Sequence, residues 1–263
     1  TFHSFGLQFL REEYKSYGIR SRFPIYDDSD TRSVLTEILR EIGGLTQAEK
    51  DVDGIRRQIS RWKMNFISPE KALDGSVDDT EELQARAYLR YKDRMKGFNA
   101  VDFDDLIHLP VLLLESDSEV RDRWQKRFDH LLIDEYQDTN SAQYRFARAL
   151  VDQRENLCVV GDDDQSIYAF RGAEVEKILY FNKDFPKAHV VTLEKNYRSV
   201  ASILEPANAV ISKNPKRHPK KLISMRGAGE TIRFSSYDGD QEEASAVVIS
   251  IHKMSQMGLP LSK

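Results

Sequence analysis

Cysteine is almost absent from this chain of 263 residues, which carries Cys158 alone. One cysteine excludes an internal disulfide, and the apolar run LCVV around it predicts a buried, unreactive thiol. The sequence has no apolar stretch of about eighteen residues, and its start, TFHSFGLQFL, lacks the basic segment of a signal peptide. We therefore expect no membrane-spanning segment and a reducing compartment.

An excess of positive charge is also lacking. Lys and Arg number 39 against 43 Asp and Glu, and the formal net charge is −4. Proteins that hold nucleic acid by bulk attraction are usually basic. If this chain binds DNA, we expect a local groove that combines base stacking with a few phosphate contacts.

No phosphate-binding loop is present, because no Gly-Lys pair occurs anywhere in the sequence. Such a loop, GxxxxGK[ST], holds nucleotide phosphates with its backbone N–H groups and its lysine. The chain opens on Thr rather than Met, and its last residues, GLPLSK, closely follow a helical pattern. We expect both ends to be cuts within a longer protein.

Apolar residues recur at helical spacing through most of residues 1–128. Beyond them, helical segments separate three short apolar runs, at 130–134, 157–160 and 190–193. Strands that alternate with helices are typical of βαβ units and a parallel sheet. A further α/β stretch begins near Glu194, with a strand expected at 232–234. The predicted fold class is α/β.

The run LLIDE at 131–135 is the strongest local signal for chemistry. A buried strand fixes the carboxylates at its carboxyl end, and open α/β sheets bind ligands at that edge. Asp134 is the candidate ligand for Mg²⁺, which prefers hard oxygen donors. Glu135 is the candidate general base that polarises an attacking water. The alternative is an ordinary strand that ends in a capped turn.

Longer motifs surround this run in a fixed order. They are TFHSFG at 1–6, VDFDDLI at 101–107, DEYQDTN at 134–140, GDDDQSIYAFRGA at 161–173 and LEKNYRS at 193–199. Together they resemble the UvrD/PcrA/Rep group of superfamily 1 DNA helicases, and most closely its Rep members. DEYQDTN resembles the Walker B motif of that group, GDDDQSIYAFRGA its third motif, NYRS its fourth, and TFHSFG its DNA-contacting motif. The resemblance covers essentially the whole chain.

The resemblance implies a P-loop NTPase (RecA-like) motor domain with a helical insertion, followed by the start of a second RecA-like domain. Residues 1–128 would be the insertion, 129–192 the second half of the first motor domain, and 193–263 the first part of the second. The parent protein would be a bacterial, cytoplasmic ATPase that moves 3′-to-5′ on single-stranded DNA and unwinds duplex DNA in replication or repair. ATP and Mg²⁺ are the implied cofactors, and replication or repair proteins the implied partners.

The same resemblance assigns roles around the nucleotide. Gln165 matches the residue that contacts the γ-phosphate, and Arg198 an arginine that the second motor domain contributes. The always charged guanidinium of Arg198 suits phosphate oxygens that gain charge during transfer. Tyr197 matches the aromatic ring that stacks on adenine, and Arg171 an arginine near the phosphate end. A structural polar contact is the alternative for each of these four.

Contact with DNA is implied for Phe2, His3, Tyr168 and Phe170. Aromatic faces hold unpaired bases without reading their sequence, which suits a motor that must step along any strand. The family commonly has Trp where this chain has Phe170, and Phe stacks over less area and has no N–H donor. Phe2 could instead belong to a helix core, and we assign Phe5 to that core.

Three functions stay open. The first is a truncated helicase motor that is inactive alone, because the phosphate loop is missing from it. The second is a helicase-nuclease subunit, although the third motif of such subunits usually departs from the GDDDQS found here. The third is a non-catalytic module that binds DNA or docks on another protein.

Overall fold

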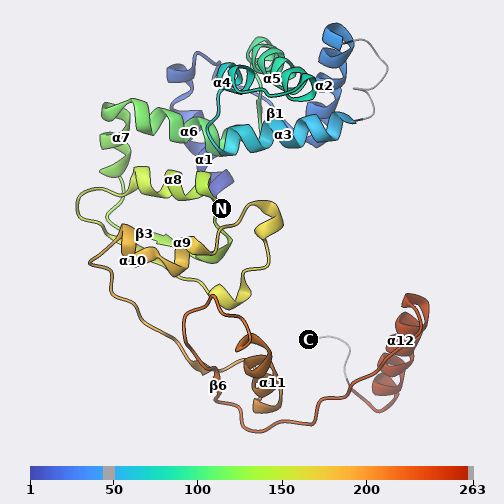
Figure 1. The fold of residues 1–263 in the computed structure, drawn as a ribbon. Coiled ribbons are helices and arrows are strands. Elements are labelled where there is room, and N and C mark those ends of the chain that lie inside the picture. The colour runs from blue at the N-terminus through green and yellow to red at the C-terminus, as the bar shows by residue number, and fades with distance from the viewer. Residues whose placement is uncertain (44–50, 260–263) are drawn as a thin grey trace. The chain divides into compact units, whose positions relative to one another are not determined.

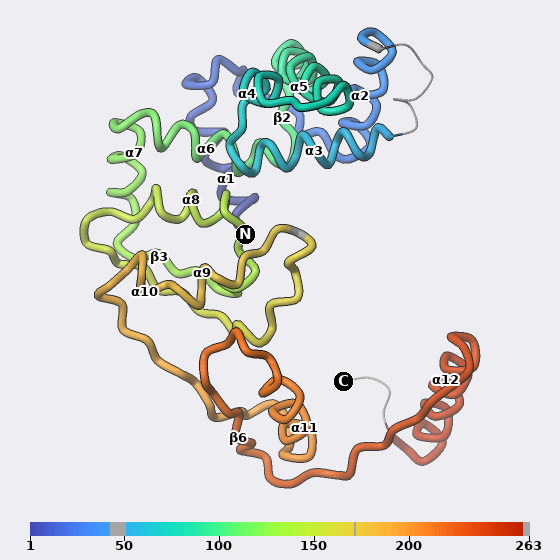
Figure 2. The backbone as a smooth tube through the Cα atoms, in the orientation of Figure 1, coloured from blue at the N-terminus to red at the C-terminus, as the bar shows by residue number. Residues whose placement is uncertain are grey.

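The computed structural model describes residues 1–43 and 51–259, and its chain divides into two units, Thr1–Ala188 and His189–Lys263. Helices hold more residues than strands in each unit, and each unit also contains short parallel strands, so the fold is a helix-rich α/β fold (Figures 1 and 2). The predicted α/β class is confirmed at this level.

Four helices of the first unit gather around one hydrophobic core (Figure 1). They are α2 (Asp28–Gly43), α3 (Val52–Met64), α4 (Pro69–Asp74) and α5 (Asp79–Phe98). Polar side chains cap three of them: Asp51 begins α3, Ser68 begins α4 and Asp78 begins α5. Their apolar stripes bury Leu35, Ile38 and further side chains between 34 and 100. The spacing of apolar residues predicts the third of these helices over residues 46–66, and Thr46 lies outside the described residues.

A second core joins helices from distant parts of the sequence. Its helices are α1 (Phe2–Glu12), α6 (Asp105–Ser116), α7 (Ser118–Gln125) and α8 (Ser141–Leu150). Phe9, Trp124 and Phe146 fill it without measurable exposure. Helices α1 and α6 approach so closely that a Cβ at position 6 would overlap the carbonyl oxygen of Leu106, which explains Gly6. After α1, the short 3₁₀ helix η1 (Tyr14–Tyr17) ends at Gly18, whose φ is 65°.

The strands of the first unit form two small parallel sheets. The first pairs β1 (Ile25–Tyr26) with β2 (Val101–Asp102), and the second pairs β3 (Leu131–Ile133) with β4 (Leu157–Val159). In the second sheet Leu132 lies opposite Cys158, and both side chains are exposed. The prediction of a buried thiol is therefore wrong, because alternate residues of this sheet face opposite sides and only one side is covered.

Short elements complete the first unit. After β3 and β4 come three 3₁₀ turns and two one-turn helices: η3 (Tyr136–Asp138), η4 (Asp163–Gln165), η5 (Ala169–Arg171), α9 (Glu176–Leu179) and α10 (Phe181–Asp184). The backbone and the side chains of η3 and η4 shape the candidate site below.

The second unit contains β5 (Lys195–Asn196), α11 (Ala201–Ile211), β6 (Ile223–Ser224) and α12 (Asp240–Gln256). Strands β5 and β6 pair in parallel. The strands predicted at 190–193 and 232–234 do not form, and these two predictions are wrong. Val191 and Leu193 are exposed, and no strand of the described residues lies beside them to pair with. An isolated strand has no hydrogen-bonded neighbour and no stability of its own.

Candidate functional site

The carboxylates of Asp134 and Glu135 stand at the carboxyl end of β3, where the sequence predicted them. The chain continues beside the end of β4. The Val160 N–H donates to the Ile133 carbonyl at 2.8 Å, and the Tyr136 N–H donates to the Val160 carbonyl at 2.9 Å. Both acidic side chains are exposed. They are thus fixed at their backbone and open to a ligand at the sheet edge.

Glu135 has a strained backbone. Its φ of 51° and ψ of 44° lie in the left-handed region, which costs a residue with a Cβ roughly 1 kcal/mol or more. The Glu135 N–H donates to Asp134 Oδ1 at 2.9 Å. Such strain persists only where neighbouring contacts hold it.

Gln137 supplies one of those contacts, and its role was not predicted from the sequence. Its side chain is 1% exposed. Nε2 of Gln137 donates to Glu135 Oε2 at 2.8 Å, and Oε1 accepts the Asp162 N–H at 3.0 Å. The motif DEYQDTN contained this residue, but nothing in the sequence distinguished a buried bridge from an exposed amide.

The same contacts bring Gln165 into the site. Asp162 begins η4, and its Oδ2 accepts from Gln165 Nε2 at 2.8 Å. A continuous chain of side chains and one peptide N–H thus runs from Glu135 through Gln137 and Asp162 to Gln165. The structure therefore brings together the two residues that were predicted to polarise water and to contact the γ-phosphate.

The remaining nucleotide candidates are Tyr197, Arg198 and Arg171. Tyr197 is 70% exposed, and the Arg198 N–H donates to Asn196 Oδ1 at 3.0 Å. Both belong to the second unit, so their approach to Gln165 stays a prediction. The side chain of Arg171 lies outside the part of the chain that the structure describes.

The donor set at the end of β3 fits a hard cation. It offers carboxylate oxygens, which Mg²⁺ prefers, and the exposure of Asp134 leaves room for the waters that Mg²⁺ retains. Nearby, the carboxyl of Asp138 has a buried Oδ1 with no hydrogen-bond partner among the described residues. Burial and the charge of Glu135 raise the pKa of Asp138. Negative charge thus concentrates at this edge, as a cation site requires.

The predicted DNA contacts divide into exposed and packed rings. Phe170 is 79% exposed, and its ring centroid lies 6.1 Å from that of Tyr168. The His3 ring lies 5.0 Å from Phe103, which is 57% exposed and was not predicted as a contact. Phe2, in contrast, packs on Phe146 at 6.5 Å as part of the second core. Phe5 packs in the same core, as predicted.

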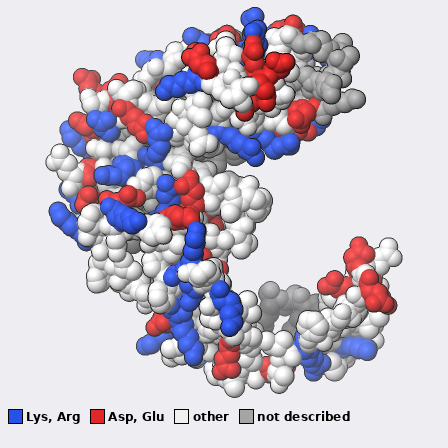
Figure 3. All heavy atoms as spheres, in the orientation of Figure 1, with Lys and Arg blue, Asp and Glu red and all other residues white. Residues whose placement is uncertain are grey.

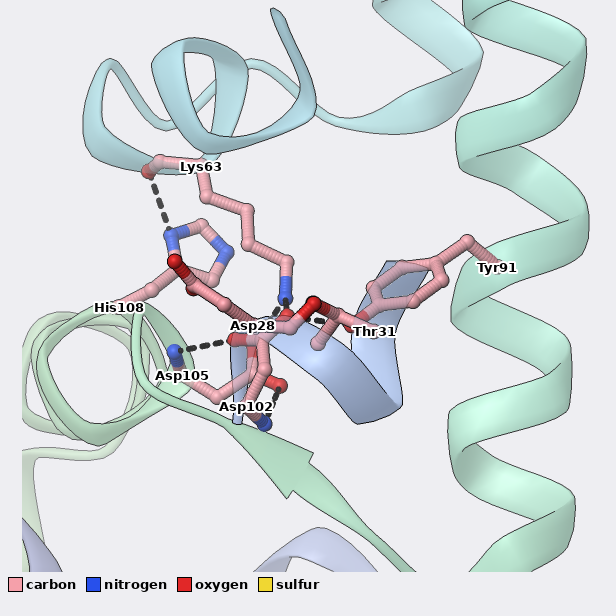
Figure 4. A network of polar contacts seen from close by, with 7 residues as sticks. All are labelled: Asp28, Thr31, Lys63, Tyr91, Asp102, Asp105 and His108. Atoms are coloured by element: carbon pink, nitrogen blue, oxygen red, sulfur yellow. Dashed lines mark hydrogen bonds and ion pairs between the residues drawn. The ribbon is translucent and has the colours of Figure 1, made fainter. Parts of the chain in front are cut away.

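A buried ion cluster includes Lys63, Asp102 and Asp105 (Figure 4). Nζ of Lys63 contacts Asp102 Oδ2 at 2.6 Å and Asp105 Oδ1 at 2.8 Å, and the Tyr91 hydroxyl donates to Asp102 at 2.8 Å. Burial lowers the pKa of Lys63, but the two carboxylates outweigh it and hold this pKa above its usual value. The cluster joins α3 and α5 to β2 and α6, so it fixes the backbone on both sides of Phe103.

Charge on the visible face of the first unit is mixed. Lys and Arg lie interspersed with Asp and Glu there, and no broad basic surface forms on that face (Figure 3). The expectation that DNA is held locally by rings rather than by bulk attraction stays a prediction. None of the helices that the structure describes has the length and apolar character needed to cross a bilayer.

Comparison with known proteins places these motifs in one family. The family model of the UvrD/REP helicase N-terminal domain matches residues 1–186, and that of the UvrD-like helicase C-terminal domain matches 191–263. ATP-dependent DNA helicase Rep of Salmonella typhimurium is 41% identical over 248 residues, which cover 94% of this chain and 36% of that protein.

Two other named helicases match at similar identity. ATP-dependent DNA helicase PcrA of Leuconostoc citreum is 38% identical over 254 residues, which cover 97% of this chain and 34% of that protein. ATP-dependent DNA helicase UvrD1 of Mycobacterium tuberculosis is 40% identical over 267 residues, and the match covers 97% of this chain and 34% of that protein. The chain spans about a third of the length of these relatives. From its motifs, its site and these matches, the chain belongs to the UvrD/REP helicase family.

Proposed function

We propose that this chain is part of an ATP-dependent DNA helicase that moves 3′-to-5′ on single-stranded DNA and unwinds duplex DNA in bacterial replication or repair. The hydrogen-bonded chain from Glu135 to Gln165 carries this proposal, because it joins a candidate base to a candidate phosphate sensor at one sheet edge. The β3–β4 pair would belong to a RecA-like sheet that also holds the phosphate loop, outside residues 1–263.

Each candidate residue has a task in this proposal. Asp134 would hold Mg²⁺, which neutralises phosphate charge when bound. Glu135 would accept a proton from the attacking water, and Gln165 would contact the γ-phosphate. Arg198 and Arg171 would stabilise phosphate charge, and Tyr197 would stack on adenine. The relatives named above are ATP-dependent DNA helicases, which supports the choice of nucleotide and substrate.

We also propose how the domains divide. The core formed by residues 34–100 is separate from the core that joins α1, α6, α7 and α8. This separation supports an insertion made of α2 to α5, with α1, α6 and α7 assigned to the motor domain beside α8. The insertion would then be shorter than the predicted 1–128. The second RecA-like domain would begin close to the division at Ala188 and His189.

A charge-removing variant of the base tests the ATPase proposal in the full-length protein that contains this chain. Glu135→Gln keeps side-chain length but removes the charge that accepts a proton, so we expect DNA-stimulated kcat to fall by roughly 10²–10⁴-fold with nucleotide binding retained. Glu155→Gln is the matched control, because Glu155 is also exposed and also has a positive φ, of 54°. Full activity in Glu135→Gln, or no ATPase in the parent protein, would refute the proposal.

Stacking on DNA is tested at Phe170, the most exposed of the four predicted DNA-contact residues. Phe170→Ala should weaken binding of single-stranded DNA by about 1–3 kcal/mol, and Phe170→Trp should strengthen it. The slope of log Kd against log salt should not change, because no phosphate contact is removed. A changed slope with unchanged affinity at low salt would contradict stacking at this position.

A non-catalytic DNA-binding or docking module is the second candidate, favoured by the exposed Phe170 and Phe103 in a chain without a phosphate loop. Salt-sensitive binding of single-stranded DNA, together with no nucleotide binding by the full-length protein, would support it over the motor.

A further inference from the structure

Gln137 connects two segments that the proposed mechanism needs to act together. Its Nε2 lies 2.8 Å from Glu135 Oε2, and its Oε1 lies 3.0 Å from the Asp162 nitrogen. The orientation of the amide follows from its neighbours. The Asp162 N–H can only donate, so the side-chain oxygen must face it and the NH₂ group must face the carboxylate.

The environment of Gln137 allows few substitutes. With 1% exposure, both ends of the amide lack water and need protein partners. Only a side chain with a donor and an acceptor at this length satisfies a carboxylate and a peptide N–H together. The space is closed on the other side by Gly161, where a Cβ would lie 2.7 Å from Gln137 Oε1. Gln137 therefore fits this position in both its length and its hydrogen-bonding groups.

We propose that Gln137 is a positioning residue that holds the Glu135 carboxylate in place and couples it to the segment that carries Gln165. This inference rests on the proposed function. The Glu135 side chain is exposed, so the hydrogen bond from Gln137 Nε2 is what keeps its carboxylate in one orientation. Asp162 accepts from Gln165 through its carboxylate and donates to Gln137 through its peptide N–H. A shift of Gln165 on phosphate contact therefore reaches the base through three hydrogen bonds and two intervening residues.

Two variants separate positioning from simple support of the fold, in the full-length protein. Gln137→Glu keeps an oxygen for the Asp162 N–H but replaces the amide donor, so the new carboxyl either repels Glu135 or shares a proton with it. Gln137→Met removes both contacts at similar volume. Gln143→Glu is the matched control, because Gln143 uses only its Oε1, which accepts the Asn140 N–H at 3.2 Å in the capping box of α8.

The readouts are kcat and KM for ATP, together with hydrogen exchange of the Asp162 amide without nucleotide. In Gln137→Glu we expect kcat to fall about tenfold or more, KM to change less than about twofold, and the amide to stay protected. In Gln137→Met we expect the same loss of kcat together with at least severalfold faster exchange. Gln143→Glu should match the wild type in all three.

Three results would overturn the inference. Wild-type kcat in Gln137→Glu would show that Glu135 does not depend on the amide donor, and would leave Gln137 a structural residue. Unchanged exchange in Gln137→Met would show that Asp162 is not tied to it. Absence of ATPase in the wild-type protein would refute the proposed function and remove the catalytic role, while the exchange data would still report whether the tie exists. If Gln137→Met fails to fold, Gln137→Glu still decides the question.

Discussion

At the scale of single residues, Gly161 lies where the candidate site leaves no room for a side chain. A Cβ there would lie 2.8 Å from Ile178 Cδ1 and 3.1 Å from the Tyr136 nitrogen, in addition to its contact with Gln137. Gly161→Ala should therefore destabilise the protein by about 1–3 kcal/mol through overpacking and lower kcat by displacing Gln137.

Gly97→Ala is the control for that substitution. Gly97 lies in α5 and is exposed, and a Cβ added there would meet no atom within 4 Å. Alanine there should be neutral or stabilise by up to about 1 kcal/mol, because glycine is a poor helix former. Urea unfolding and steady-state ATPase assays measure both variants. A Gly161→Ala protein with wild-type stability and kcat would show that the turn shifts at little cost.

Residue identities in the site were predictable where a motif combined with a strand end. Asp134 and Glu135 followed from an apolar run that ends in two acids, and their exposure at the sheet edge agrees with that reasoning. Gln137 and Phe103 were not predictable in the same way. Whether an amide is buried, or a ring exposed, depends on contacts between segments that are distant in sequence. Gln137 meets the Asp162 N–H at the start of η4, and Phe103 meets the His3 ring of α1.

At the scale of elements, the Lys63 cluster should control how firmly α3 and α5 are held to β2 and α6. Removing its cation leaves the carboxylates of Asp102 and Asp105 buried without a countercharge. Lys63→Met should therefore cost about 3–5 kcal/mol of unfolding free energy. Lys92→Met removes a partner of Glu70 from an exposed pair and should cost less than about 1 kcal/mol.

Fluorescence reports directly on this comparison, because both tryptophans, Trp62 and Trp124, lie in the first unit. Urea unfolding of the 263-residue chain gives both free energies. Equal losses for Lys63→Met and Lys92→Met would mean that water reaches the cluster and that its charges are not buried as described.

The same cluster gives stability a dependence on pH. Burial and the charge of Asp102 raise the pKa of Asp105 to about 7, against 3.8 for an ordinary aspartate. Between pH 3.8 and about 7 the Asp105 carboxyl is ionised in the unfolded chain but protonated in the folded chain. The free energy of unfolding therefore falls as pH rises through this range, and the contribution of Asp105 stays level above about pH 7. Lys63 of α3 contacts the Asp105 carboxylate at 2.8 Å, and the Asp102 N–H of β2 donates to it at 3.1 Å. Tyr91 of α5 bonds Asp102, and the His108 ring of α6 bonds the Lys63 carbonyl.

Asp105→Asn removes that titration. The unfolding free energy of the variant, relative to wild type, should therefore rise from about pH 4.5 to about pH 7.5 and then stay level. Urea unfolding across this range measures the difference. A difference that falls with pH would mean that Asp105 is held ionised by Lys63, with a depressed rather than a raised pKa.

Helices and strands differed in how far the sequence determined them. Apolar periodicity, which is local, predicts a helix over residues 28–42, and α2 forms over Asp28–Gly43. The strands expected at 190–193 and 232–234 were apolar but did not form, because a strand also needs a neighbour whose position no local pattern contains. Strands β3 and β4 formed because each pairs with the other in a parallel sheet.

At the scale of the whole molecule, the sequence order of the motifs identified the family but not the packing of its parts. The predicted insertion of 1–128 treated α1 and α6 as continuous with α2 to α5. Their apolar faces instead meet α8 across long stretches of sequence, through Phe9, Ile107 and Phe146. When helices are far apart in the sequence, the sequence alone does not indicate which core their buried side chains belong to.

The complete site should need more than this chain contains. Residues 1–263 hold the carboxylates and the candidate sensor but no GxxxxGK[ST] sequence, and without that loop no backbone N–H cradle holds the phosphates. A purified chain of these residues should therefore release phosphate from ATP at the rate of the blank, with or without single-stranded DNA. A longer protein that adds the loop should show DNA-stimulated release. Glu135→Gln in the short chain is the control: release above blank that this substitution removes would show that the phosphates are held by other residues of this chain.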